Sequence, residues 1–332
     1  MVAKQNIQFQ KVIAITGVLL FGVKMLAWYL THSLSVLTDA LESIVNVITG
    51  FIGLYSLYLS ARPRDQNHPY GHGKVEFVSA AIEGTMISIT GIIIIYEAIS
   101  GFSNASTLNE VDYGILLVSF TAIINYFLGY FAVQKGKGNN SAALVATGKH
   151  LQTDTYTTLG IVLGLTLIYF TDLYWLDSVM AIAFAGIIIF TGFRIVRSSL
   201  AGIMDESDFE QLEKVVELLQ EKRKENWIDL HNLRLIKFGS TLHLDCHLTV
   251  PWYLNVNESH QEVDSLEKLV RDKFGESVEL FIHTDGCVEF SCKICTKTDC
   301  PVRKFDFVKR IDWTLDNAYQ NNKHRLAEPP IK

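Results

Sequence analysis

Apolar residues dominate the first 200 positions and form runs long enough to cross a lipid bilayer. A membrane-spanning helix needs about 20 mostly apolar residues. The chain contains six such runs: Gln10–Tyr29, Ser33–Ser60, Phe77–Phe102, Tyr113–Val133, Ala142–Phe170 and Tyr174–Ile195. From about Asp205 the chain becomes charged and amphipathic. The pattern predicts an α-helical membrane protein, with a six-helix transmembrane bundle over residues 1–204, a soluble domain over 205–286 and a cysteine-rich extension over 287–332.

The loops between the runs carry positive charge on one side only. Lys and Arg occur before the first run and after the second, fourth and sixth runs, whereas the opposite loops contain neither. Since such charges stay on the cytoplasmic side, we expect a multi-pass protein of the cell (inner) membrane with both termini in the cytoplasm. The N-terminal segment lacks a small-residue cleavage site, so no cleavable signal peptide is expected.

The soluble domain follows the order helix, strand, strand, helix, strand. The predicted helices are Phe209–Lys222 and Glu258–Phe274, and the predicted strands are Asn232–Phe238, Thr241–Val250 and Val278–Phe281. Gly239 and Ser240 form the expected hairpin turn between the first two strands. This order predicts a small α+β domain.

Four polar side chains interrupt the second and fifth apolar runs in two matched pairs. Glu42 and Asn46 are four residues apart, as are His150 and Asp154, so each pair lies on one helix face. Ionisable groups at membrane depth are costly and mark ion paths, and imidazole and carboxylate bind divalent cations such as zinc. The pairs predict a metal-transport site, with Asp39 as a further ligand or a hydrogen-bond acceptor for one. Bonds to a neighbouring helix are the structural alternative.

Lys24 and Glu83 also lie near membrane depth, in the first and third runs. For both we expect an internal ion pair, or snorkelling of the long side chain to the interface. A contribution to the charge of the transport site is the alternative.

The loop after the second run combines turn residues with metal-binding side chains. Its sequence from residue 68 is HPYGHGKVE, in which one proline and two glycines indicate a turn. Asp65, His68 and His72 are therefore candidates for binding one cation. A solvated loop with incidental histidines is the alternative.

Four of the five cysteines form a cluster near the C-terminus. Cys287, Cys292, Cys295 and Cys300 are separated by four, two and four residues. In a reducing compartment such a cluster binds metal more often than it forms disulfides. An all-thiolate zinc site is expected, with an iron–sulfur cluster, a redox pair and free thiols as alternatives.

Charge and motif content narrow the class of function. The net charge of −6 argues against a nucleic-acid partner. The apolar runs contain no HExxH motif, so an intramembrane metallohydrolase is disfavoured and we predict that the protein is not an enzyme.

Several of these motifs resemble those of the cation diffusion facilitators, membrane antiporters that export divalent metals in exchange for protons. HPYGHGKVE is similar to a loop of that family, SLSVLTDA (residues 33–40) to the start of its second span, and GIMD (202–205) to its domain junction. The family's transport ligands fall on Glu42, Asn46, His150 and Asp154. Asn46 is neutral where the family usually has a carboxylate or imidazole, and Glu42 replaces an Asp or His.

The resemblance also implies the architecture of the soluble domain. It implies a cytosolic ferredoxin-like domain that forms a homodimer and binds metal at the positions His231, His247, His260, His283 and Asp285. It further implies an ion pair between Lys74 and Asp205 at the junction.

The expected function is proton-coupled efflux of a divalent metal from the cytoplasm. Zinc is the first expectation for the metal, as substrate and as a bound ligand of the cytosolic sites, and iron(II), manganese, cobalt, nickel and cadmium stay open. The partners are a second copy of the chain, the lipid bilayer and protons. A membrane-anchored metal sensor that acts through the cytosolic domain is the alternative.

Overall fold

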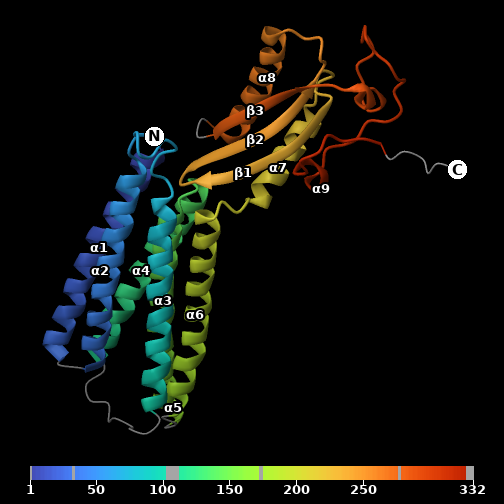
Figure 1. Cartoon of the computed structure of the whole chain (residues 1–332). Helices are drawn as coiled ribbons and strands as arrows, with labels where there is room; N and C mark the ends of the chain where they lie inside the picture. The colour runs from blue at the N-terminus through green and yellow to red at the C-terminus, as the bar shows by residue number, and fades with distance from the viewer. Residues whose placement is uncertain (1, 32–33, 102–111, 172–174, 276–277, 327–332) are drawn as a thin grey trace. The chain divides into compact units, whose positions relative to one another are not determined.

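The apolar first part of the chain folds into long helices (Figure 1). The computed structural model describes residues 2–31, 34–101, 112–171, 175–275 and 278–326, in two units that comprise residues 1–204 and 205–332. The described part of the first unit contains α1 (Val2–Thr31), α2 (Leu34–Ser60), α3 (Val75–Gly101), α4 (Asp112–Gly138), α5 (Ala142–Thr171) and α6 (Trp175–Ile203). Each helix coincides with one predicted apolar run. Helices α1, α4 and α6 extend beyond their runs, because backbone hydrogen bonding continues into polar sequence.

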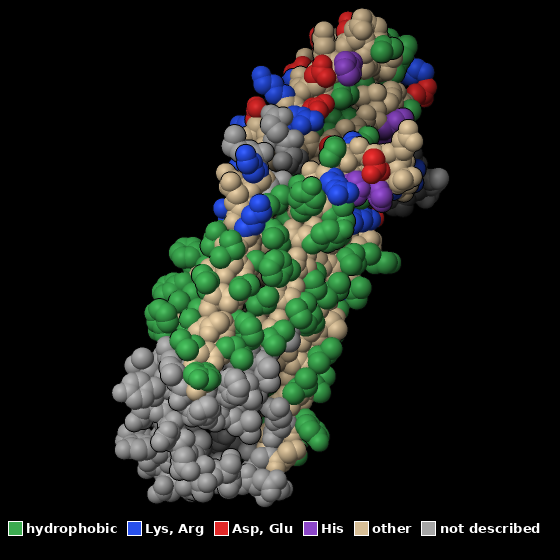
Figure 2. Space-filling view, turned by 90° about the vertical axis from the view of Figure 1, so that its left-hand side faces the viewer, with side chains coloured by type: hydrophobic (Ala, Val, Ile, Leu, Met, Phe, Trp, Pro, Cys, Tyr) green, Lys and Arg blue, Asp and Glu red, His purple; other side chains and the backbone are tan. Residues whose placement is uncertain are grey.

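Much of the surface of these helices is apolar. Among the described residues, α1, α3 and α6 each contain a stretch that is long and apolar enough to cross a membrane: Lys4–Leu26, Val75–Ser100 and Ala185–Ile203. Large side chains such as Ile15, Ile92 and Phe190 are more than half exposed, and hydrophobic side chains cover the helices in the face shown in Figure 2. Soluble proteins rarely expose apolar patches of this extent. The surface is therefore suited to contact with lipid.

Glycines allow the helix backbones of the first unit to approach closely. A Cβ added at Gly148 of α5 would lie 2.8 Å from the carbonyl oxygen of Gly129 on α4, and one at Gly192 of α6 would lie 2.7 Å from that of Gly84 on α3. Small residues at such crossings let helices pack tightly in lipid. The α4–α5 and α3–α6 pairs are accordingly among the most extensively packed helix pairs of the described unit.

The second unit is built on a three-stranded sheet. Its elements are α7 (Phe209–Glu221), β1 (Asp229–Phe238), β2 (Thr241–Val250), α8 (Val256–Phe274) and β3 (Val278–Gly286). Strand β2 lies in the centre, antiparallel to β1 and parallel to β3. The predicted order of elements and the turn at Gly239, which has a φ of 63°, are confirmed. The ferredoxin-like assignment stays a prediction.

The two faces of this sheet differ in chemistry because successive strand residues point to opposite sides. Leu244, Cys246 and Leu248 of β2 are buried in a core that includes residues of α7 and α8. The alternating positions His243 and His247 belong to the other face. Burial raises the pKa of the Cys246 thiol to about 12, so Cys246 acts as a small apolar core residue.

The described part of the C-terminal extension packs on this same domain. It contains a 3-10 turn, η1 (Glu289–Lys293), and a short helix, α9 (Leu315–Ala318). Trp313 and Ala318 belong to the core formed by the sheet and its helices. The guanidinium carbon of Arg223 lies 4.0 Å from the centre of the Trp313 ring. The extension therefore contributes to the stability of the domain.

Asp208 at the start of α7 is expected to stabilise the second unit in a pH-dependent way. Its carboxylate accepts a hydrogen bond from the backbone N–H of Gln211 (3.1 Å) and pairs with Lys237 of β1. Burial alone would raise the pKa of Asp208, but these bonds outweigh burial and hold it below the usual value. The stabilisation is therefore complete above about pH 4 and is lost as the pH falls through the lowered pKa.

We expect Asp208→Ala to destabilise α7 by about 1–2 kcal/mol at pH 7. Hydrogen exchange of the α7 amides should reveal this loss, and the difference from the wild type should shrink in acid. Asp272→Ala, which changes an exposed residue of α8, is the control. Equal protection of α7 in wild type and Asp208→Ala would contradict the assignment.

Candidate metal-binding sites

Helices α2 and α5 bring three of the predicted transport ligands together. Nε2 of His150 lies 2.6 Å from Oδ1 of Asn46, and the Asn46 amide nitrogen donates to the Asp154 carboxylate. Because the Asn46 amide donates to Asp154, its oxygen faces His150, and Nε2 of His150 is the donor. His150 is buried, and its Nδ1 has no hydrogen-bond partner among the described residues. His150 and Asp154 on α5 thus both contact Asn46 of α2, and their role as metal ligands stays a prediction.

A small cavity adjoins this group. Its volume is about 20 Å³, close to what one water molecule occupies. Four helices supply its walls: Ile13, Gly17, Leu20, Ser43, Asn46, Thr49, Asn125, Thr147, His150 and Leu151. Glu42 and Asp39 lie on α2, one and two turns before Asn46, but their side chains are outside the described residues. Their roles as ligands stay predictions.

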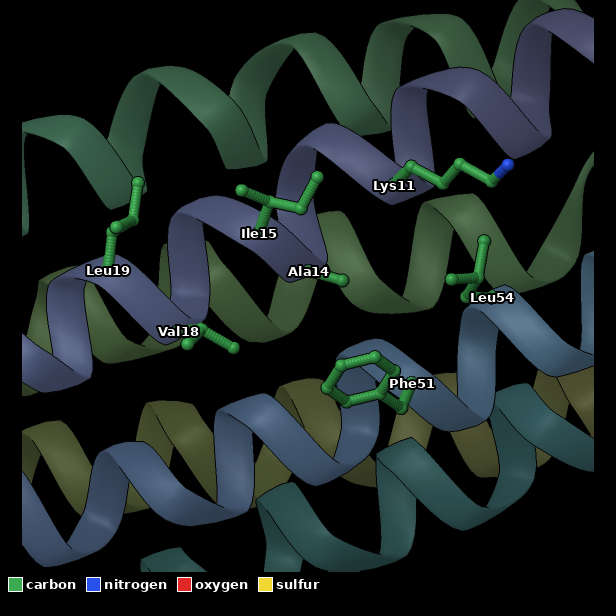
Figure 3. A pocket seen from close by; sticks show the side chains of 7 residues that line it. All are labelled: Lys11, Ala14, Ile15, Val18, Leu19, Phe51 and Leu54. Carbon is green, nitrogen blue, oxygen red and sulfur yellow. The ribbon is translucent and has the colours of Figure 1, made fainter.

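A wider groove between α1 and α2 has a different character (Figure 3). Its volume is about 340 Å³, and its walls are Lys11, Ala14, Ile15, Val18, Leu19, Phe51 and Leu54. These walls offer no metal ligand, because the ammonium group of Lys11 has no free lone pair and repels cations. Ile15 and Leu19 are more than half exposed. We conclude that the groove belongs to the lipid-facing surface and not to the ion path.

Glu83 of α3 does not snorkel to the interface, contrary to one of the two arrangements expected from the sequence. It is fully buried, and its two carboxylate oxygens lie 2.9 and 3.0 Å from the hydroxyl of Thr147 on α5. Gln10 of α1, also fully buried, donates to the same hydroxyl over 3.3 Å. Sequence reasoning missed Gln10 and Thr147. The available signal was their polarity within or next to apolar runs.

The loop between α2 and α3 brings its three predicted ligands together. Asp65 Oδ1 lies 3.1 Å from Nδ1 of His68, and Asp65 Oδ2 lies 3.3 Å from Nε2 of His72. The backbone N–H of His68 donates to Asp65 and is the main cause of its lowered pKa. A turn at Gly71, whose φ is 92°, carries the chain back between the histidines. The three side chains lie close together, and cation binding stays a prediction.

Three histidines form a row across the sheet of the second unit. His231, His247 and His283 are paired in register on β1, β2 and β3. Two positions further along the strands, Asp229 and Asp285 flank the central strand in the next row on the same face. The sheet register therefore gathers residues that lie up to 56 positions apart in the chain.

Asp285 is the point at which these side chains converge. One of its oxygens, Oδ2, lies 3.5 Å from Nε2 of His231 and 3.3 Å from Nδ1 of His247. The other, Oδ1, lies 3.7 Å from Nε2 of His283. His260 is on α8, where its Nε2 lies 3.6 Å from Asp264, and it is not part of this group in the structure as described. Four of the five predicted residues are thus brought together.

The C-terminal extension reaches the same group. Lys323 Nζ lies 3.6 Å from Asp285 Oδ1 and donates to the carbonyl oxygen of Gly286 over 3.0 Å. His324 Nδ1 lies 2.5 Å from Asp229, whose other oxygen lies 3.4 Å from Nδ1 of His231. Sequence reasoning missed Lys323, His324 and Asp229, because no spacing connects the tail to the strands.

The four clustered cysteines have free thiols. Two groups of three potential ligands within 4.8 Å occur among the described residues, and the cysteines belong to neither. Burial, together with the neighbouring thiols, raises the pKa of Cys287. Arg303 orders the segment by donating to the carbonyl oxygens of Cys292 and Cys295 at 2.9 and 3.1 Å. The all-thiolate metal site stays a prediction.

Lys74 lies at the end of the loop between α2 and α3. Its ammonium donates to the carbonyl oxygen of Ile203, the last residue of α6, over 3.4 Å. The ion pair between Lys74 and Asp205 stays a prediction.

Together these features define a class of protein: a helical membrane domain with a polar group between two helices, joined to a small domain with a histidine-rich sheet face. The sequence profile of the cation efflux transmembrane domain matches residues 11–204, and that of the cytoplasmic domain of cation efflux proteins matches residues 207–287. The chain therefore belongs to the cation efflux family, the cation diffusion facilitators.

Several relatives cover most of the chain. It is 30% identical over 253 residues to the uncharacterized transporter sll1263 of Synechocystis, a match that covers 76% of this chain and 81% of the relative. It is 24% identical over 270 residues to the cation-efflux pump FieF of Shewanella oneidensis, with 81% and 90% covered. It is 23% identical over 254 residues to the manganese efflux system protein MneS of Bacillus subtilis, with 76% and 87% covered. The protein is a membrane transporter of the cation efflux type.

Proposed function

We propose that this protein exports a divalent transition metal from the cytoplasm by exchange for protons. The observation that most strongly supports this proposal is the contact of Asn46 on α2 with both His150 and Asp154 on α5. One imidazole, one carboxylate and one amide oxygen meet in a partly buried position between the two helices, and Glu42 supplies a second carboxylate. The metal enters as the transported substrate and replaces the hydrogen bonds among these side chains.

Proton coupling follows from the chemistry of the ligands. Imidazole and carboxylate must be deprotonated to bind a metal ion, so protons and metal compete for His150 and Asp154. Metal binds from the cytoplasmic side, and protons displace it after the helices rearrange around the site. The step changes no covalent bond other than those to the exchanged protons.

The choice of metal depends on the ligand set. Zinc is the first candidate because imidazole and carboxylate are common zinc ligands. The amide oxygen of Asn46 and the carboxylates of Glu42 and Asp154 tilt the preference toward manganese or iron(II). A manganese efflux protein among the relatives supports the inclusion of manganese. Cobalt, nickel and cadmium complete the panel to be tested.

The proposed assembly is a homodimer in the inner membrane, with six spans per chain and both termini in the cytoplasm. The distribution of Lys and Arg supports this orientation. The match of the second unit to the family's cytoplasmic domain supports dimerisation through this unit. Metal at His231, His247, His283 and Asp285 would stabilise the dimer.

A membrane-anchored metal sensor is the second candidate. The histidine row of the second unit and the Asp65, His68 and His72 loop favour it, because both groups lie outside the apolar helices. A sensor has no use for ligands at membrane depth, so the group of Asn46, His150 and Asp154 favours transport.

The test is metal flux into proteoliposomes under an imposed pH gradient. Zinc, iron(II), manganese, cobalt, nickel and cadmium are compared one at a time, with empty liposomes as the control. Flux of one metal that reverses with the pH gradient supports the antiporter. Binding without flux of any metal would reject transport and leave the sensor.

Zinc is expected to stabilise the second unit through the histidine row. A ligand present at 100 times its dissociation constant adds about 2.7 kcal/mol to the free energy of unfolding. Hydrogen exchange of the β1 to β3 amides should slow on addition of Zn²⁺ and recover with a chelator. Asp285→Ala should abolish the effect, whereas His260→Ala, outside the group, should retain it. An equal response of both variants would contradict this assignment.

A further inference from the structure

A second buried polar group lies next to the proposed transport site. It consists of Glu83 on α3, Thr147 on α5 and Gln10 on α1, all almost completely buried. Thr147 lines the same cavity as Asn46 and His150. It precedes His150 by three residues, which corresponds to about 4.5 Å along the helix axis. The group therefore lies toward the start of α5, the end of the helix that we place at the cytoplasm.

Gly53 of α2 makes room for this group. A Cβ at this position would lie 2.7 Å from Nε2 of Gln10, 3.0 Å from Oγ1 of Thr147 and 3.1 Å from Oε1 of Glu83. Three polar atoms from three helices thus converge on the bare backbone of a fourth. The arrangement requires glycine at position 53, since the side chain of any other residue would displace at least one of these polar atoms.

In this group the carboxylate charge is not compensated by a cation, and not every polar atom has its own hydrogen-bond partner. Thr147 has a single hydroxyl proton to offer the two carboxylate oxygens of Glu83. Among the described residues, no Lys, Arg or His makes an ion pair with Glu83. Oε1 of Gln10 is also buried, and it has no hydrogen-bond partner among the described residues. A buried carboxylate without a compensating cation is costly, and an unpaired buried amide oxygen adds to that cost.

Glu76, seven residues earlier on α3, shows the contrast. It is also buried, but its carboxylate accepts hydrogen bonds from Ser60 at 2.8 Å and from Ser141 at 2.5 Å. Two separate donors satisfy its two oxygens. Glu76 therefore links helices, whereas the two oxygens of Glu83 share the single hydroxyl donor of Thr147.

We propose that Glu83, Thr147 and Gln10 form an entry site that binds the divalent cation on its way from the cytoplasm to the transport site. This inference rests on the proposed transport function. The ligands are one carboxylate, one hydroxyl and one amide oxygen, a set suited to hard divalent cations such as Mn²⁺. One formal charge makes the site weaker than the transport site. Weak binding is what a transit site requires, because the ion must leave it again.

The test measures initial rates of Mn²⁺ and Zn²⁺ uptake into everted membrane vesicles, whose outer face is the cytoplasmic one. We expect Glu83→Gln to raise the KM for the metal at least about tenfold, which corresponds to 1.4 kcal/mol, and to leave kcat within about threefold. Thr147→Val should shift KM in the same direction, and Thr147→Ser should stay near the wild type. Glu76→Gln is the matched control and should leave KM unchanged.

Each alternative result has a separate meaning. Uptake is first measured for the wild type, and its absence would reject the proposed transport function itself. With the wild type active, an unchanged KM in Glu83→Gln would overturn the entry site. A changed proton-to-metal ratio at unchanged KM would also overturn it, because the carboxyl group would then carry protons. Loss of kcat in both Glu83→Gln and Glu83→Asp would indicate a purely structural role and overturn it as well.

Discussion

Asp154→Ala is expected to reduce metal transport at least about 100-fold. Mutating a residue that only positions a metal ligand typically costs about 10- to 100-fold in metal affinity or activity, so the loss of a direct carboxylate ligand should cost at least the upper end of this range. Asp154 is the described carboxylate of the transport group, and it also holds Asn46 in place for His150. Its loss therefore removes charge and positioning at once. Initial rates of flux into proteoliposomes, at saturating metal and a fixed pH gradient, measure the effect.

Two further variants make this result specific. Asp154→Asn preserves the shape of the side chain without its charge, and it should fail almost as completely as Asp154→Ala. Thr155→Ala removes a hydroxyl that bonds to backbone oxygens of Ala122 and Leu151 at 3.2 and 3.0 Å, and it should retain transport. Transport within tenfold of the wild type in Asp154→Ala would contradict the proposed site.

Gly148→Leu is expected to prevent correct packing of α4 against α5. A Cβ at Gly148 would lie 2.7 Å from the backbone nitrogen of Val133 and 2.8 Å from the carbonyl oxygen of Gly129. Both are backbone atoms, so a side chain cannot simply rotate away, and we expect a loss near the upper end of the 1–3 kcal/mol typical of overpacking, about 3 kcal/mol. The backbone of α5 would have to move to relieve these clashes, and this movement would occur only two residues before the predicted ligand His150.

The measurement is the yield of folded, monodisperse protein and its apparent melting temperature in detergent. Gly186→Leu on α6 is the matched control, since a Cβ there would meet no atom within 4 Å. The control should melt within a few degrees of the wild type, whereas Gly148→Leu should give little folded protein and no metal flux. Similar melting of the two variants would contradict the close α4–α5 crossing.

The long helices could be predicted because their signal is local. A run of apolar residues of bilayer length requires no knowledge of distant contacts, and each run corresponds to one helix of the structure. The ends of α1, α4 and α6 differ from the ends of the predicted runs, because polar residues can continue a helix that the pattern of apolar residues does not reveal. The order of α7, β1, β2, α8 and β3 could also be predicted, since the period of the hydrophobic residues and the turn residues distinguish strands from helices.

Part of the candidate sites could be predicted for the same reason. The spacing of His150 and Asp154 places both on one face of α5, and alternation places His247 on the polar face of β2. Proximity of Asp65, His68 and His72 follows from a short loop. Spacing did not show that Asn46, neutral and a weak ligand, bonds both members of the α5 pair.

The amino-acid sequence by itself determined the long helices, the order of helices and strands along the second unit, the residue types available for metal binding and the family. Only the tertiary structure decided which distant residues meet. Gln10 and Thr147 are 137 positions apart and Glu83 and Thr147 are 64 positions apart, yet they share one buried site. Lys323 reaches Asp285, whereas the four cysteines, close in sequence, form no tight ligand group in the described structure. The reason is physical: periodicity sets the face on which a side chain lies, and packing alone sets what faces it.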